Sequence, residues 1–163
     1  MILHDREIRY GQVHWNLVEP FSYDQVQPGS YDVLLGKEFV YPDMPAGKVI
    51  APEFFLLEPG DFVLGTTLEY VRVPHNMTVF LHGKSSLARR GLIIHTTAGL
   101  IDAGFQGNIT LELLNVSKKP LLLTPGMRIG QLTFHQMMGT ATQPYAGRYQ
   151  GQLGTTPSRP EKQ

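Results

Sequence analysis

Glycine and proline interrupt this sequence so often that the segments between them are short. The chain of 163 residues contains 17 glycines and 12 prolines. They separate runs rich in Val, Ile, Leu, Phe, Tyr and Thr, which are residues that strands favour, whereas Gly and Pro favour the turns between strands. The pattern predicts a mainly β fold, and the length suits a single domain.

Residues 108–116 show the clearest strand pattern. By period-two alternation, the apolar side chains at 109, 111 and 113 fall on one face, and Thr110, Glu112 and Leu114 fall on the other. The remaining expected elements are strands at 62–73, 77–82, 92–96 and 128–136, turns at 58–61 and 124–126, and helices from 5 to about 10 and from 85 or 86 to 90.

The second expected helix carries signals at both ends. A serine stands at its start and Gly91 follows its end, which matches the preferences of helix caps. The tail, residues 145–163, is poor in apolar residues and rich in Gly, Pro, Ser and Gln. Taken alone, such a segment is expected to stay flexible until something orders it.

Charge and cysteine content exclude several classes of function. Lys plus Arg and Asp plus Glu both number 14, so no overall field favours nucleic acid or an anionic membrane. The absence of cysteine removes disulfides, cysteine-ligated zinc, iron–sulfur clusters and cysteine nucleophiles. No H-E-x-x-H spacing or G-x-S-x-G elbow is present. Charged residues are 17%, against about 25% in an average domain, which suggests surface hidden by self-association.

The N-terminal ten residues carry charges where a secretion signal would need an apolar stretch. The longest apolar runs, such as 54–57 and 121–123, are far shorter than the roughly 20 residues that span a bilayer. We therefore expect a soluble, cytoplasmic protein without a membrane or nucleic-acid partner.

Residues 83–90, with the sequence GKSSLARR, place three cations and two hydroxyls at a predicted helix N-terminus. Free backbone N–H groups, hydroxyls and cations together suit the binding of a phosphate chain. A serine-capped surface helix with solvated arginines explains the same residues equally well. The segment is not a Walker loop, because G-x-x-x-x-G-K-[ST] is absent.

Two carboxylates are further candidates. Asp102 follows an apolar pair and stands between Gly99 and Gly104, and small residues let a ligand approach the backbone closely. A turn-forming aspartate is the commoner explanation of such a position. Glu112 lies in the middle of an otherwise apolar strand, where an ordinary solvent-facing residue is the simpler explanation.

Five segments together closely resemble the dCTP deaminase branch of the dUTPase superfamily. They are QPGSYDVLLG at 27–36, GKSSLARRGL at 83–92, HTTAGLIDAGFQGNITLELLN at 95–115, PGMRIGQLTF at 125–134 and PYAGRYQGQLGTTPSR at 144–159. The resemblance implies a distorted jelly-roll β-barrel, assembled as a homotrimer with active sites shared between neighbouring subunits. It also implies a β domain at 1–144, a tail at 145–163 that closes over the active site, and Mg²⁺ bound with the nucleoside triphosphate.

The resemblance also assigns roles to residues. Glu112 would be the acid/base that takes a proton from the water attacking C4 of cytosine and returns protons to the base and the departing amine. No zinc is implied, because the chain lacks the cysteines of zinc-dependent nucleobase deaminases. Ser85, Arg89 and the Ala98 carbonyl would position this water, and Asp102 would serve triphosphate hydrolysis. The implied substrate-binding residues are Lys84, Ser85, Ser86, Leu87, Ala88, Arg89, Asp102, Thr110, Leu111, Glu112, Gln131, Tyr145, Arg148 and Gln152.

The pair Ala98 and Gly99 bears on the product. Family members that release dUTP resemble T-A-H-R-I-D here, and dUMP-forming members resemble T-A-G-x-I-D; this chain has TAGLID at 97–102. A glycine would leave space for a second water, so the resemblance implies that dCTP is converted to dUMP, diphosphate and ammonia. The alternatives are a deaminase that releases dUTP, a dUTPase alone, which Glu112 argues against, and a non-catalytic nucleotide-binding trimer.

Three positions depart from the family pattern. Lys84 stands where many members have Arg, and Arg148 stands where Lys is usual. Both keep the charge, although Arg and Lys differ in hydrogen-bond geometry. Leu34 replaces a common Arg and cannot make its contacts. His95 and Thr96 lie where feedback inhibition by dTTP acts in the family, which makes dTTP a further candidate ligand.

Overall fold

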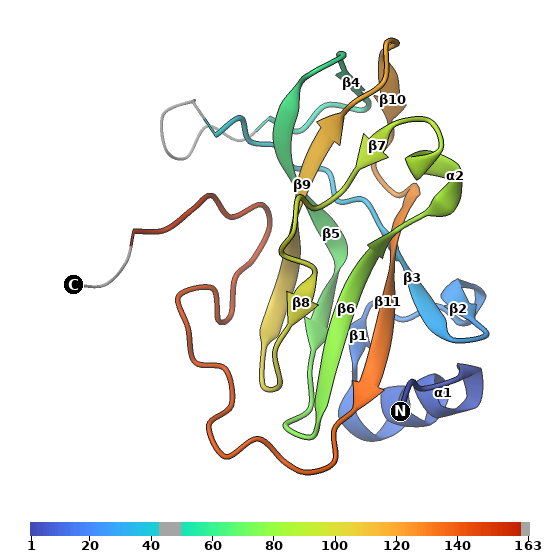
Figure 1. The fold of residues 1–163 in the computed structure, drawn as a ribbon, viewed down its shortest axis with the longest axis vertical. Coiled ribbons are helices and arrows are strands. Elements are labelled where there is room, and N and C mark those ends of the chain that lie inside the picture. The colour runs from blue at the N-terminus through green and yellow to red at the C-terminus, as the bar shows by residue number, and fades with distance from the viewer. Residues whose placement is uncertain (43–49, 161–163) are drawn as a thin grey trace.

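A computed structural model describes residues 1–42 and 50–160 (Figure 1). A four-stranded sheet has the order β1 (Val18–Glu19), β5 (Phe62–Arg72), β9 (Gln106–Asn115), β7 (Leu92–Ile93). A five-stranded sheet has the order β2 (Val26–Gln27), β3 (Ser30–Leu34), β11 (Arg128–Gln136), β6 (Met77–Gly83), β8 (Leu100–Ile101). A small ladder pairs β10 (Leu121–Leu123) with β4 (Phe55–Leu57). The mainly β prediction is confirmed, although the sheets of the described residues do not close into a continuous barrel.

The long strands match the sequence pattern closely. The strands expected at 62–73, 77–82 and 128–136 appear as β5, β6 and β11 with ends shifted by at most one residue, and the one expected at 108–116 is β9. Both expected turns form, with Asp61 N donating to Glu58 O at 3.0 Å and Met127 N donating to Thr124 O at 3.0 Å. The strand expected at 92–96 is wrong beyond its first two residues, because the chain leaves the ladder after Ile93 and bends.

The N-terminal helix is longer than the sequence suggested. Helix α1 spans Asp5–Trp15 and passes through Gly11, where a Cβ would lie 2.7 Å from Leu17 Cδ1, so the glycine admits a close contact instead of ending the helix. The chain leaves α1 at Asn16, in the left-handed conformation. A single 3-10 turn covers Tyr23–Gln25. In the two described ranges, no helix is long and apolar enough to cross a membrane.

Helix α2 is only one turn, Ser85–Ala88. The expected serine cap is wrong: Lys84 occupies the N-cap position and no side chain caps the helix there. The expected glycine at the other end is confirmed, since Gly91 has φ +94° and its Cβ would meet Ser117 backbone and side-chain atoms within 3.1 Å. Glycine is therefore required at this turn both by conformation and by space.

The core lies between the two larger sheets, and β9 shows how it is built. Ile109, Leu111 and Leu113 are buried, as the alternation predicted, while Thr110 and Glu112 face the opposite side. Burial of alternate residues is what pins the register of a strand, since a slip by one residue would expose the whole apolar set.

The pairing of β5 with β9 contains a bulge whose polar groups are satisfied by side chains. The register shifts between Thr66 and Tyr70. At this point Ile109 N donates to Thr67 Oγ1 at 2.9 Å, and Thr67 Oγ1 donates to Glu69 O at 2.8 Å. The threonine hydroxyl thus replaces the ladder bonds that the bulge removes.

Leu34, the departure in the N-terminal segment, lies beside a buried carboxylate. Its N–H donates to both oxygens of Glu69, at 3.1 and 3.0 Å, and Gln25 Nε2 donates to Glu69 Oε1 at 2.7 Å. Burial raises the pKa of the Glu69 carboxyl above its ordinary value, partly offset by these hydrogen bonds. Backbone and amide donors therefore satisfy this buried carboxylate.

Buried and exposed leucines alternate along β10, so neighbouring leucines should contribute very differently to the free energy of unfolding. Leu123 is 1% exposed and belongs to the core, whereas Leu122 is 51% exposed. Leu123→Ala should lower the free energy of unfolding by about 2 to 5 kcal/mol, because it leaves a cavity, and Leu122→Ala by less than about 1 kcal/mol. Chemical denaturation of both variants measures the difference. Equal losses would contradict the described register of β10.

Candidate active site

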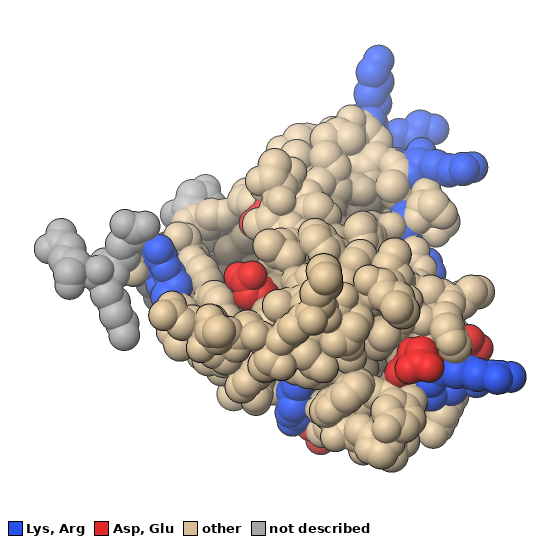
Figure 2. Space-filling view, turned by 60° about the horizontal axis from the view of Figure 1, so that its bottom comes forward, with Lys and Arg blue, Asp and Glu red and all other residues tan. Residues whose placement is uncertain are grey.

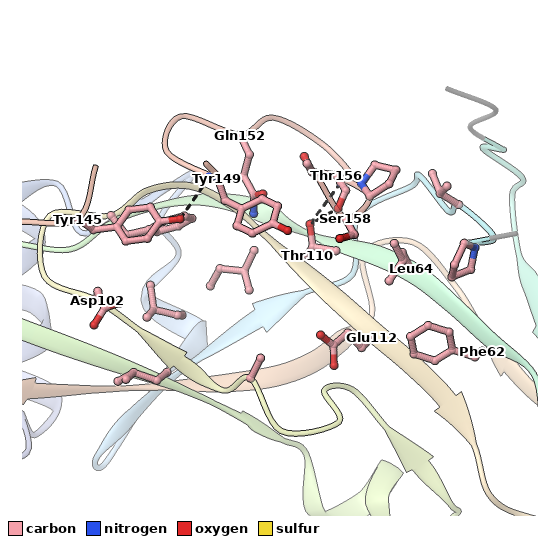
Figure 3. A pocket seen from close by; sticks show the side chains of 18 of the residues that line it. Phe62, Leu64, Asp102, Thr110, Glu112, Tyr145, Tyr149, Gln152, Thr156 and Ser158 are labelled. Carbon is pink, nitrogen blue, oxygen red and sulfur yellow. Dashed lines mark hydrogen bonds between the residues drawn. The ribbon is translucent and has the colours of Figure 1, made fainter. Parts of the chain in front are cut away.

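A hollow of about 690 Å³ lies beside β9, with the C-terminal tail as its roof (Figure 3). Strand β9, the segment after β8 and the tail each contribute side chains to it. Its lining residues are Val40, Tyr41, Pro42, Phe62, Leu64, Ala98, Leu100, Ile101, Asp102, Phe105, Ile109, Thr110, Glu112, Tyr145, Tyr149, Gln152, Thr156, Pro157 and Ser158. We call this hollow the β9 pocket.

Glu112 projects from β9 into the pocket because it lies on the face opposite the core residues. Its backbone is held from both sides, with Leu64 paired to it on β5 and its own N–H donating to Ile94 O at 2.9 Å. Its carboxylate is held as well, since Thr96 N and Thr96 Oγ1 both donate to Oε2, at 2.7 and 2.5 Å. Of the two explanations that the sequence left open, a group directed at a ligand fits this geometry better than a solvent-facing residue.

Asp102 lines the same pocket from the segment after β8. Its carbonyl accepts from Phe105 N at 3.1 Å, and Gly104 in this turn has φ +89°. Asp102 is therefore a turn residue, as the plainer explanation held, and also a pocket carboxylate. The turn directs the side chain of Asp102 to the pocket, at the Tyr145 end in Figure 3.

Ala98 lines the pocket, but Gly99 does not. A Cβ at Gly99 would lie 3.0 Å from His95 Cε1 and 3.1 Å from Leu81 O. The space that glycine leaves in this chain is thus filled by the His95 ring and a neighbouring strand. The small residue lets the loop pack closely.

The tail is not the free segment that its composition suggested, since the described part packs on its own chain. Gly107 and Gln152 form a parallel bridge, and Gln152 Nε2 donates to Asn108 O at 2.6 Å. Farther on, Thr155 Oγ1 donates to Glu38 O at 2.7 Å and Thr155 N donates to Glu38 Oε2 at 3.2 Å. Most of these hydrogen bonds between the tail and the domain involve a side chain. The low apolar content of the tail therefore did not predict that it would be held in place.

The tail also supplies the aromatic wall of the pocket. The rings of Tyr145 and Phe105 meet edge to face with centroids 5.8 Å apart, and Tyr149 N donates to Tyr145 Oη at 3.2 Å. Thr156 N donates to Thr110 Oγ1 at 3.3 Å, which ties the tail to the pocket face of β9. The sequence missed Tyr149 and Thr156 as pocket residues, because nothing local shows which strand a tail will cross.

The segment expected to bind phosphate, residues 83–90, lies outside the β9 pocket. None of the described residues 84–89 lines the β9 pocket. Ser85, Ser86, Ala88 and Arg89 are exposed, and Leu87 packs against the core. Of the other expected ligands, Gln131 donates to Ser30 Oγ at 3.2 Å, Arg148 NH1 donates to Arg159 O at 2.7 Å, and the Leu111 side chain is buried in the core.

Lys84 forms an ion pair with Asp32, a residue that the sequence analysis did not single out. Its Nζ donates to Asp32 Oδ1 and Oδ2, at 2.9 and 2.8 Å, and Arg128 NH1 donates to Asp32 Oδ2 at 3.1 Å. The signal was an aspartate between the apolar residues Tyr31 and Val33, in the middle of one of the quoted segments. Such a carboxylate needs partners from distant parts of the chain.

The pocket is acidic in a chain of zero net charge. Its lining includes two carboxylates and no lysine or arginine among the described residues. Figure 2 shows a hollow with acidic side chains beside it, while most of the lysine and arginine side chains in view stand at the edges of that face. No three described His, Asp or Glu side chains are grouped so that they could hold a metal ion.

Comparisons with known proteins agree with one another. The family model for dCTP deaminase-like proteins matches residues 2–137. A protein of Persephonella marina named "dCTP deaminase, dUMP-forming" is 45% identical, with 98% of this chain and 97% of the relative aligned. A protein of the same name from Leifsonia xyli is 44% identical, with 98% and 90% aligned.

Two solved structures share the fold. The 2'-deoxycytidine 5'-triphosphate deaminase of Agrobacterium tumefaciens superposes with a TM-score of 0.70 at 23% identity, over 83% of this chain and 48% of that one. A dUTPase from phage phi11 of S. aureus superposes with a TM-score of 0.53 at 18% identity, over 80% of this chain and 95% of that one. This chain therefore spans about half the length of the A. tumefaciens chain.

The contact between Thr155 and Glu38 predicts how firmly the tail is held. Thr155→Val keeps the side-chain shape but removes the hydroxyl bond, which should free the nearby tail amides to exchange with solvent about 10-fold faster. Amides of the β5–β9 ladder should keep their rates. Hydrogen exchange measures both sets, and Thr124→Val, at an exposed threonine, is the matched control. Unchanged exchange at Gly154 and Thr156 would show that this bond does not hold the tail.

Proposed function

The chain belongs to the dCTP deaminase-like family, and we propose that it converts dCTP and two waters to dUMP, diphosphate and ammonia. The observation that carries the proposal is the presence of two carboxylates, Glu112 and Asp102, in the single β9 pocket. Two hydrolytic steps need two activated waters, and each carboxylate can serve one of them. The names of the relatives support the same overall conversion.

In the first step, water attacks C4 of cytosine. Glu112 takes the proton of this water and delivers protons to N3 and the departing amine, which releases ammonia and leaves uracil. The two Thr96 donors on Oε2 support this role, because they hold one oxygen of a carboxylate that lines the pocket. No zinc is needed in this scheme, since Glu112 itself activates the water.

In the second step, a further water attacks the α-phosphorus of the dUTP still bound. Asp102 accepts its proton, and the bond to the β-phosphate oxygen breaks to give dUMP and diphosphate. The support is that Asp102 lines the pocket that holds Glu112, so that one bound nucleotide can present its base to one carboxylate and its phosphates to the other. The dUTP intermediate then does not have to leave the pocket between the two steps.

The cations for the phosphates come, in this proposal, from a neighbouring subunit of a homotrimer. The β9 pocket lacks lysine and arginine among the described residues, and the Lys84–Arg89 segment lies outside it. A second copy that brings this segment to the pocket would join Ser85 and Arg89 to Glu112. The low fraction of charged residues also supports a substantial buried interface.

Mg²⁺ is proposed to bind with the nucleotide. Since the described residues include no cluster of three ligating side chains, the phosphate oxygens and water would supply most of its ligands, which is how Mg²⁺ is commonly held in nucleotide sites. The ion would neutralise phosphate charge near Asp102. The tail, through Tyr145, Arg148 and Gln152, is proposed to close over the triphosphate, and dTTP is a candidate inhibitor of the same pocket.

A product assay tests the proposal. Purified protein is incubated with dCTP and Mg²⁺, nucleotides are resolved, and ammonia and diphosphate are measured together. We expect dUMP, with one diphosphate per ammonia. Accumulation of dUTP without dUMP would instead indicate a dUTP-releasing deaminase, and dUTP hydrolysis without ammonia from dCTP would indicate a dUTPase. Binding of dCTP without any product would indicate a non-catalytic trimer.

The Glu112→Gln variant separates the two steps. The amide keeps the shape and can still accept from Thr96, but it cannot take a proton, so ammonia release from dCTP should fall by about 10² to 10⁴. Hydrolysis of added dUTP should persist, because Asp102 is intact. Glu58→Gln, at an exposed glutamate outside the pocket, is the control and should keep the parental rate. Ammonia release at the parental rate by Glu112→Gln would refute the role of Glu112.

A further inference from the structure

A completely buried carboxylate joins three segments of the chain that are far apart in sequence. The Asp32 side chain, on β3, is 0% exposed and contacts Lys84, just before α2, and Arg128, at the start of β11. Arg128 NH2 also donates to Asp24 O at 2.9 Å. The two cations are only partly buried, at 23% and 43% side-chain exposure.

The strand order brings these groups together. Strand β11 lies between β3 and β6, and Gln131 stands in register with Asp32 on one side and His82 on the other. Lys84 follows the end of β6 and reaches across to β3. A buried carboxylate without partners would be very costly, so the two cations are a condition for Asp32 being where it is.

We propose that Asp32 is a positioning residue for phosphate recognition, acting by holding Lys84 at the place where the phosphate chain of the substrate binds. The inference depends on the proposed function, in which Lys84 contacts the phosphates. The backbone supports it, because Lys84 O accepts from Leu87 N at 3.0 Å and Ala88 N at 2.9 Å. The contact that fixes the Lys84 side chain therefore also fixes the residue from which α2 starts.

Charge alone predicts the opposite effect of removing Asp32. One carboxylate against two cations leaves a net charge of one positive unit, and removing the carboxylate raises it, which would attract a triphosphate more strongly. Positioning predicts weaker binding, because a released lysine regains side-chain freedom that phosphate binding must then remove. The sign of the change in affinity separates these two explanations.

The test is Asp32→Asn, which is similar in shape and removes the charge. We expect KM for dCTP to rise about 10-fold while kcat changes less than about 3-fold. The Kd of dCTP, measured by calorimetry in the Glu112→Gln background where turnover is blocked, should rise by the same factor as KM. A KM and Kd that stay constant or fall would overturn the proposal.

A double-mutant cycle shows whether Asp32 acts through Lys84. In a Lys84→Met background, Asp32→Asn should change the Kd of dCTP less than about 2-fold, because the group that it positions is gone. Full additivity of the two changes would overturn the proposal. Glu69→Gln is the matched control, since Glu69 is equally buried but contacts Gln25 and the Leu34 backbone and not Lys84. The Kd of the Glu69→Gln variant for dCTP should match that of the parent.

Two further outcomes keep this test distinct from that of the proposed function. If Asp32→Asn does not fold, Asp32→Ser, which is smaller, replaces it in the same measurements. A parent protein that binds dCTP without product would contradict the proposed function, and the Kd comparison would still decide the role of Asp32. A parent that does not bind dCTP would overturn both.

Discussion

The long antiparallel pairing of β5 with β9 is the constraint on which the rest of this molecule depends. It forms the middle of the four-stranded sheet, with β1 and β7 at its edges. Because successive side chains of β9 point to opposite faces, one register places Leu111 and Leu113 in the core and Thr110 and Glu112 in the pocket. The energy of the core thus fixes the position of the proposed acid/base, and a shift of this register would lose both.

A second constraint is the burial of charge at Asp32. Asp32 on β3 meets Lys84 after the end of β6 and Arg128 at the start of β11. The carboxylate therefore has its partners only when these three strands are paired in the five-stranded sheet. Three of the segments that carry the family resemblance supply these groups. One ionic contact inside a single chain therefore joins three of these segments.

Features that depend on neighbours in sequence were predictable, and features that depend on distant partners were not. The alternation of apolar and polar residues predicted β9 and the face of β9 on which Glu112 lies. Glycine and proline predicted the turns that contain Gly60 and Gly126. The predicted end of the strand at 92–96 was wrong, because the chain bends after Ile93 and residues 94–96 follow the path of the loop instead of the ladder. The partner of Lys84 and the path of the tail also depend on tertiary contacts, which composition does not encode. Family resemblance supplied the site residues that spacing alone left undecided.

The way the tail is attached has a consequence for how relatives of this chain can diverge. Besides the backbone bonds around the isolated bridge of Gly107 with Gln152, single side chains such as those of Gln152 and Thr155 bind to backbone groups of the domain. Each of these side-chain contacts can be gained or lost by one substitution without disturbing the packing of the sheets. Evolution can therefore adjust the strength of the roof over the pocket in small, independent increments while the two carboxylates beneath it stay in place.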